Sequence, residues 1–98
     1  MRIIKDDRVD SFLNKLSTED NIKITKTIKL FFDYGFSLPK KYLKKLNKTI
    51  WELRVDRFRL LFGFEKDVMV IVTIFFKKTQ KTPLREIKIA IKRFKQYL

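Results

Sequence analysis

The chain has 98 residues, of which 45% are hydrophobic and 36% are charged, and its formal net charge at pH 7 is +13. This length and apolar content predict one folded domain, and they exclude a second domain and an intrinsically disordered chain. The sequence contains neither Cys nor His, so disulfides, zinc sites built from these residues and catalysis by thiol or imidazole groups are excluded, and a reducing, cytoplasmic location is favoured.

Membrane insertion and secretion are not expected. The N-terminus, Met-Arg-Ile-Ile-Lys-Asp, lacks the apolar core of a signal peptide. The longest apolar run, residues 68–76, is too short to cross a bilayer. The two glycines are isolated and form no phosphate-binding loop, and no acidic residues have the spacing of a calcium or magnesium site, so we expect neither a cofactor nor a metal.

The positive charge is concentrated in the second part of the chain. Residues 1–36 contain seven Lys or Arg against six Asp or Glu, whereas residues 37–98 contain seventeen against five. Codon bias would spread lysines more evenly, and clustered cations neutralise phosphates. This distribution predicts a polyanionic partner, with a merely solvated surface as the alternative, and it leaves RNA, DNA and acidic protein open.

The N-terminal third predicts a short strand followed by two helices. The strand covers residues 2–5, and the first helix covers residues 7–16, where apolar residues recur at helical spacing. Ser17 is the expected N-cap of the second helix, and Gly35 ends it. We expect these two helices to pack as an antiparallel hairpin that serves as scaffold.

A lysine-rich connector and three strands come next. Residues 36–49 follow the second helix and could form one or two helical turns. Short turns separate apolar strands at residues 50–55, 58–64 and 68–76, so we predict an antiparallel meander. In the second strand Arg59 points away from the face that carries Phe58 and Leu60.

A C-terminal amphipathic helix is the last predicted element. Thr82 is the expected N-cap and Pro83 the first helical residue, and Leu84, Ile87 and Ile91 begin an apolar stripe. The predicted fold class is therefore α+β, with an N-terminal helical hairpin packed on a small antiparallel sheet and a C-terminal helix.

RNA cleavage is a reaction that these residue types can perform. RNA carries its own nucleophile, the 2′-hydroxyl, so a protein needs to supply positioning, proton transfer and cations around the transition state. For a lysine to act as a base near neutrality, its pKa must fall well below the usual value of about 10.4. Crowding by like charges among Lys77, Lys78 and Lys81 would lower it.

Two motifs resemble the RelE/ParE toxin superfamily. Trp-Glu-Leu-Arg at residues 51–54, with Phe-Arg at 58–59, and Phe-Phe-Lys-Lys-Thr-Gln-Lys-Thr-Pro at 75–83 are most similar to the HigB-like, phage Gp49-like branch. The likeness covers essentially the whole chain and includes the order of the elements. It implies a RelE-like fold and a ribosome-dependent mRNA endonuclease that is the toxin of a type II toxin–antitoxin pair.

The resemblance also implies roles for three residues of the predicted meander. Arg59 matches the arginine that would bind the scissile phosphate, with a surface arginine paired to Glu52 as the alternative. Arg54 matches a basic position that would contact phosphate or form a structural ion pair. Glu52 departs from RelE proper, and we interpret it as an orienting partner for an arginine rather than as a proton acceptor.

The basic loop and the last helix carry the remaining candidates. Lys77 and Lys78 would clamp phosphate and shuttle protons, or simply track RNA. The tyrosine of the final helix in RelE corresponds here to Ile87, so Tyr97 is the candidate for stacking on a base, with a half-buried anchor as the alternative. The expected RNA-binding residues, which would otherwise be solvated lysines, are Lys40, Lys41, Lys44, Lys45, Lys48 and Lys81.

The implied partners are mRNA on the ribosome and a HigA-like helix-turn-helix antitoxin, with a heterotetramer of toxin and antitoxin as one possible assembly. Two other functions remain open. A ParE-like inhibitor of DNA gyrase would share the fold, because fold does not determine function. A non-catalytic, basic nucleic-acid-binding module would share the charge distribution, but Arg59 would matter no more to it than Lys44.

Overall fold

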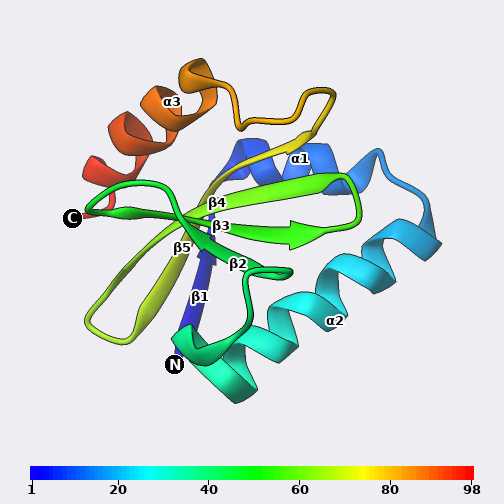
Figure 1. Cartoon of the computed structure of the whole chain (residues 1–98), viewed down its shortest axis with the longest axis horizontal. Helices are drawn as coiled ribbons and strands as arrows, with labels where there is room; N and C mark the ends of the chain where they lie inside the picture. Colours follow the sequence, from blue (N-terminus) through cyan, green and yellow to red (C-terminus); the bar gives the residue numbers. More distant parts are fainter.

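Five strands form one mixed sheet in the computed structural model, which describes residues 1–98 (Figure 1). The strand order is β1-β5-β4-β3-β2, and only the β1–β5 pair is parallel. The predicted meander is confirmed as β3, β4 and β5. The strands are β1 (Arg2–Lys5), β2 (Leu43–Lys45), β3 (Ile50–Val55), β4 (Phe58–Glu65) and β5 (Val68–Phe76).

The structure corrects two details of the predicted sheet. The connector begins with one helical turn, a 3-10 turn at Gly35–Ser37, as expected, but it also forms the edge strand β2, which was not predicted. Leu43 explains the strand, because its buried side chain joins the core while its backbone lies opposite Leu53 of β3. The sheet is also not purely antiparallel, since β1 pairs in parallel with the distant strand β5.

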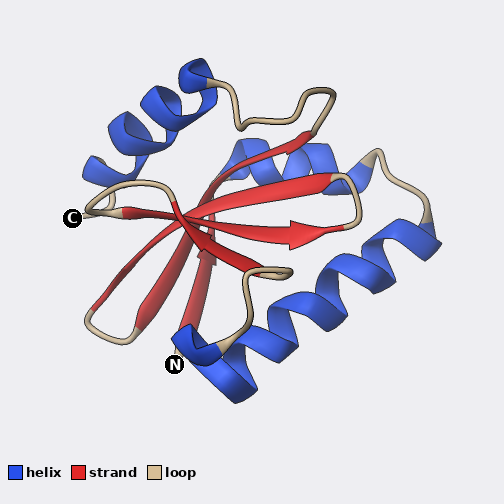
Figure 2. Ribbon diagram, viewed as in Figure 1, coloured by secondary structure: helices blue, strands red, loops and turns tan.

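Helices cover both faces of the sheet (Figure 2). One face carries α1 (Asp7–Asn14) and α2 (Thr18–Tyr34), and the other carries α3 (Leu84–Lys95). The alternation of side chains along β4 separates the two layers, because Leu60 contributes to the core under α1 and α2, and Leu61 contributes to the core under α3. Within their layer α1 packs on β5 and α2 packs on β3.

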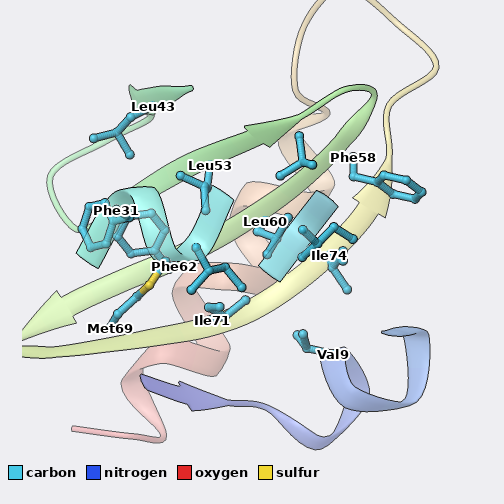
Figure 3. Packing of buried hydrophobic residues seen from close by; sticks show 13 residues of the cluster. Val9, Phe31, Leu43, Leu53, Phe58, Leu60, Phe62, Met69, Ile71 and Ile74 are labelled. Atoms are coloured by element: carbon cyan, nitrogen blue, oxygen red, sulfur yellow. The ribbon is translucent and has the colours of Figure 1, made fainter. Parts of the chain in front are cut away.

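The larger core lies between the sheet and the first two helices (Figure 3). Val9 of α1 and Phe31 of α2 are fully buried against strand residues that include Phe62 and Ile71. The rings of Phe31 and Phe62 meet edge to face, with their centroids 5.0 Å apart. This layer is the predicted scaffold, and it holds β3 and β4 in the register that the candidate site requires.

The smaller core lies beneath α3, which covers one end of the sheet. Phe94 lies directly on Gly63 of β4, where a Cβ atom would overlap its ring. Next along the strand pair, a bulge in β5 shifts its register with β4. At this bulge the side chain of Arg93, from α3, donates a hydrogen bond to the carbonyl oxygen of Val72 at 2.9 Å. The Arg59 end of β4 lies outside the region covered by Phe94 and faces the loop at residues 77–83.

The start of α3 differs from its prediction. The helix begins at Leu84, and no side chain caps it. Thr82, the expected cap, donates its hydroxyl hydrogen to the buried carboxylate of Glu52 instead. The predicted cap of α2 is confirmed, since the backbone N–H of Asp20 donates to Oγ of Ser17 at 3.1 Å. None of the three helices has the length and apolar character that crossing a membrane requires.

The buried carboxylate of Asp6 connects the two ends of the chain. It accepts hydrogen bonds from the backbone N–H of Arg8 at 2.9 Å and from the Arg8 guanidinium, and so caps α1. It also accepts a hydrogen bond from the hydroxyl of Tyr97 at 3.0 Å. The hydrogen bond from the Arg8 side chain is the main reason that the pKa of Asp6 lies far below its usual value, although burial opposes this effect.

The contact between Gly63 and Phe94 predicts the effect of adding one methyl group. We expect Gly63→Ala to lower the free energy of unfolding by about 1–3 kcal/mol, because overpacking forces α3 away from the sheet. Urea denaturation measures the change. The double variant Gly63→Ala/Phe94→Leu should recover part of the loss, and a single variant as stable as the wild type would contradict the packing described.

The Asp6 cluster predicts a loss of stability in acid. A carboxyl group with a lowered pKa stabilises the fold above its unfolded pKa of about 3.9, and this stabilisation is lost as the pH falls from there toward the folded pKa. Asp6→Asn should therefore be less stable than the wild type by about 1–3 kcal/mol at pH 7, and the difference should shrink between pH 4 and pH 2. Denaturation curves across this range measure it, and a difference that does not depend on pH would contradict the role of the charge.

Candidate nucleic-acid interface

Arg59 occupies a fixed position at the start of β4, on the same face of the sheet as α3. Its Nη1 donates to the carbonyl oxygens of Asp56 at 2.7 Å and Phe58 at 2.9 Å, so the guanidinium is held against the β3–β4 turn. Only 12% of the side chain is exposed, and its buried Nε has no hydrogen-bond partner. Burial lowers the pKa of Arg59, while the negative charge of Glu52 acts in the opposite direction.

Glu52 is a fully buried carboxylate beneath these cations. One oxygen accepts a hydrogen bond from Nε of Arg54 at 2.9 Å and lies 3.8 Å from Nε of Arg59. The other oxygen accepts the hydrogen bond from Thr82. Both oxygens are engaged and neither is exposed, so this geometry supports the orienting role and leaves no free oxygen to take a proton from a bound molecule.

Arg54 connects the carboxylate to the lysine-rich connector. Its guanidinium bonds to Glu52 through Nε, and its Nη1 donates to the carbonyl oxygen of Lys40 at 3.3 Å. Its backbone N–H donates to the carbonyl oxygen of Tyr42 at 2.7 Å. About a quarter of the side chain is exposed, so Arg54 forms a structural ion pair and still presents charge to the surface.

The basic loop after β5 surrounds an anion-sized cavity next to Arg59. The cavity has a volume of about 360 Å³, and its lining contains no carboxylate and no apolar side chain. The backbone N–H of Lys77 donates to the carbonyl oxygen of Arg57 at 2.7 Å, and Nε of Arg57 donates back to the carbonyl oxygen of Lys77 at 3.1 Å. The lining residues are Arg57, Arg59, Lys77, Lys78, Thr79 and Gln80.

Lys77 is the lysine whose pKa is lowered in this cavity. Burial is the largest cause, and the charges of Arg59, Arg54 and Lys44 add to it, while Glu52 opposes it. We expected crowding by the neighbouring lysines of the loop to lower the pKa. The structure assigns the effect to desolvation first and then to cations that come from other strands.

Three cavities that share lining arginines follow one another from the basic loop to the edge strand β2. The cavity beside the loop shares Arg59 with a middle cavity of about 430 Å³, and the middle cavity shares Arg54 with a third cavity of about 590 Å³. We call these three together the basic groove. The middle cavity is lined by Lys41, Tyr42, Arg54, Asp56 and Arg59, and the third by Phe36, Leu38, Lys40, Leu43, Lys44, Lys45, Trp51 and Arg54.

Most of the predicted site residues come together in the basic groove. Arg59, Arg54, Lys77 and Lys78 line it, as do the four lysines of the connector at positions 40, 41, 44 and 45, and Glu52 lies beneath it. Lys48 and Lys81 line none of its three cavities. No group of acidic residues in the structure is arranged to hold a metal ion.

The placement of Tyr97 corrects one site prediction. Its hydroxyl bonds to Asp6, and it lines a separate cavity with Glu65, the last residue of β4, and Lys66 of the β4–β5 turn, at the far end of β4 from Arg59. Burial and the hydrogen bond to Asp6 raise its pKa. Tyr97 is therefore an anchor for the C-terminal segment and not part of the basic groove.

Sequence reasoning did not identify Arg57, Thr79, Gln80 and Tyr42 as groove residues. Arg57 belongs to the two-residue turn between β3 and β4, and it bonds to the start of the basic loop. The signal was the short turn, because in an antiparallel meander the β3–β4 turn lies beside the end of β5. Tyr42 was visible only as an aromatic residue among lysines. Its position in the groove depends on the strand β2, which local periodicity did not reveal.

The Glu52 carboxylate predicts a difference between two single variants. We expect Glu52→Gln to reduce the free energy of unfolding by about 2–4 kcal/mol, since a charged hydrogen bond is lost and two partly buried arginines lose their counter-charge. Thr82→Val removes one neutral donor and should cost about 1 kcal/mol. Chemical denaturation compares the two, and equal losses would contradict the charge-pairing role of Glu52.

The family model that describes phage-derived Gp49-like proteins matches residues 11–95 of this chain. No protein among the curated sequences matches it. Its fold is similar to that of RelE in the archaeal RelE–RelB complex from Pyrococcus horikoshii, with a TM-score of 0.66 and 16% identity over 78% of this chain and 93% of the other.

Two further solved structures have the same fold. The RelB–RelE antitoxin–toxin complex from Methanococcus jannaschii matches with a TM-score of 0.59 and 14% identity over 74% of this chain and 88% of the other. The isolated E. coli RelE toxin matches with a TM-score of 0.63 and 11% identity over 99% of this chain and 98% of the other. The chain thus belongs to the phage-derived Gp49-like family, and its fold is that of the RelE toxins.

Proposed function

We propose that this protein is the toxin of a type II toxin–antitoxin system and that it cleaves mRNA on the ribosome, without a metal, through attack by the 2′-hydroxyl of the RNA. The observation that carries the proposal is the cavity at Arg59. Four cationic side chains surround it, no carboxylate lines it, and one of its lysines has a lowered pKa. These are the features that an in-line attack on a phosphodiester requires from a protein that lacks His.

Arg59 is the residue that we assign to the scissile phosphate. Two backbone carbonyl oxygens fix its Nη1, so the guanidinium needs little rearrangement when charge develops on the phosphate oxygens. Lys78 and Arg57 line the same cavity and clamp the phosphate from its other side. Arg54 lines the middle cavity together with Arg59. We assign it to the next phosphate along the strand.

Lys77 is the residue that we assign to proton transfer. Its lowered pKa increases the fraction of neutral amine that can accept the proton of the 2′-hydroxyl. The 2′-oxygen then bonds to phosphorus, the bond to the 5′-oxygen breaks, and that oxygen takes up a proton as it leaves. Glu52 takes no part in this transfer, because both of its oxygens are buried and bonded.

An antitoxin is the partner that we propose for the basic groove. The similar solved structures from Pyrococcus horikoshii and Methanococcus jannaschii are complexes of RelE with RelB, which supports a toxin–antitoxin pair. We propose a HigA-like helix-turn-helix antitoxin, with the two chains assembling as a heterotetramer in the cytoplasm. An acidic segment of such a partner would neutralise the groove cations.

The proposed role of Arg59 is tested by comparing Arg59→Ala with Lys48→Ala. Both variants remove one cation, but Lys48 lies outside the basic groove. Wild type and Lys48→Ala should arrest growth and create new 5′ ends inside translated frames after brief induction. Arg59→Ala should reduce cleavage by about 100-fold to 1,000-fold, the loss that follows removal of one donor to a charged transition state. Mapping of the 5′ ends of cellular mRNA measures this, and circular dichroism confirms folding.

Two outcomes would contradict the proposal in different ways. Growth arrest by the wild type without new RNA ends would exclude the nuclease and favour a protein target such as DNA gyrase. Equal, modest losses in Arg59→Ala and Lys48→Ala would indicate a nucleic-acid-binding module in which cations act by number alone.

A further inference from the structure

We propose that Tyr42 is the platform on which the base next to the cleaved phosphate stacks. This inference rests on the proposed function, and it adds a positioning residue to the same groove. The middle cavity is lined by Tyr42 together with Arg54 and Arg59, the two arginines assigned to successive phosphates. A single strand that crosses the groove therefore carries its base past this ring.

The other tyrosines and the tryptophan do not offer a free ring at this point. The chain has three tyrosines and one tryptophan. Tyr34 is exposed at the end of α2, and Tyr97 is bonded to Asp6 at the far end of β4. Trp51 lines the third cavity, but its ring packs against that of Phe36, with the ring centroids 4.7 Å apart.

Hydrogen bonds hold the backbone of Tyr42 in place and leave its side-chain hydroxyl free. Its backbone N–H donates to the carbonyl oxygen of Pro39 at 2.9 Å, and its own carbonyl oxygen accepts the N–H of Arg54 at 2.7 Å. The hydroxyl forms no hydrogen bond, and no other aromatic ring packs against this one. The ammonium of the exposed Lys41 lies over the ring at 5.2 Å, and this flexible side chain yields to a base and then follows the phosphate.

Stacking on one ring has a definite consequence for selectivity. Every base has a π-face, so this contact positions the strand without choosing its sequence. It also distinguishes single-stranded from paired RNA, because a base must leave its own stack to reach the ring. Tyr42 therefore selects an unpaired substrate, and the cations supply the affinity.

A binding experiment tests this without cleavage. The probe is a short single-stranded oligoribonucleotide with 2-aminopurine at one position and with every 2′-hydroxyl methylated, so no bond in it can be cleaved through 2′-oxygen attack. Stacking of 2-aminopurine on an aromatic ring quenches its fluorescence. The variants are Tyr42→Ala, Tyr42→Phe and the matched control Tyr34→Ala, each first shown by circular dichroism to be folded.

Wild type, Tyr42→Phe and Tyr34→Ala should quench the probe equally. Tyr42→Ala should bind it about 5-fold to 150-fold more weakly, the range for loss of one stacked base, and should not quench at saturation. Saturable binding by the wild type without quenching, or quenching that survives in Tyr42→Ala, overturns the role of Tyr42 and leaves the proposed function standing. Absence of probe binding by the wild type at low salt overturns the role of Tyr42 as a platform for a free strand, whereas the proposed function on the ribosome is decided by the mapping of 5′ ends.

Discussion

The buried carboxylate of Glu52 is the interaction on which the basic end of the molecule depends. It lies in β3, accepts a hydrogen bond from Arg54, faces Arg59 across the strand pair and holds the basic loop through Thr82. Without a counter-charge, two arginines this close would repel each other on a partly buried surface. One negative charge thus allows several positive charges to lie close together where a polyanion can reach them. Part of the net charge of +13 is in this way concentrated on one surface.

Much of this arrangement follows from local sequence pattern. Periodicity predicted all three helices and the meander, and alternation along β4 placed Arg59 on the face opposite Phe58 and Leu60. The register that sets Arg54 opposite Arg59 follows from the two-residue turn between the strands. The face and the neighbours of the central residues were therefore predictable, because they depend on residues close in the chain.

The remaining features depend on contacts between distant segments, which local patterns do not specify. The strand β2 forms because Leu43 reaches a core made by other elements, and its lysines gave no periodic signal. Thr82 has the sequence context of a helix cap, but its hydroxyl donates to a carboxylate oxygen of Glu52, thirty residues earlier. Without Thr82 that buried oxygen would have no hydrogen bond, and this costs more than an uncapped helix. Tyr97 was assigned to the site by analogy with the final helix, and Asp6, at the opposite end of the chain, holds it elsewhere.

The parallel pairing of β1 with β5 has a consequence for the order of folding. Arg2 lies opposite Val68, so the first strand made by the ribosome has no partner until most of the chain has followed. Such a distant contact must overcome a large loop-closure entropy, and it forms late compared with the meander, whose strands are neighbours in sequence. The meander that carries Arg54 and Arg59 therefore forms early, and β1 joins it late, together with α1, which packs on β5.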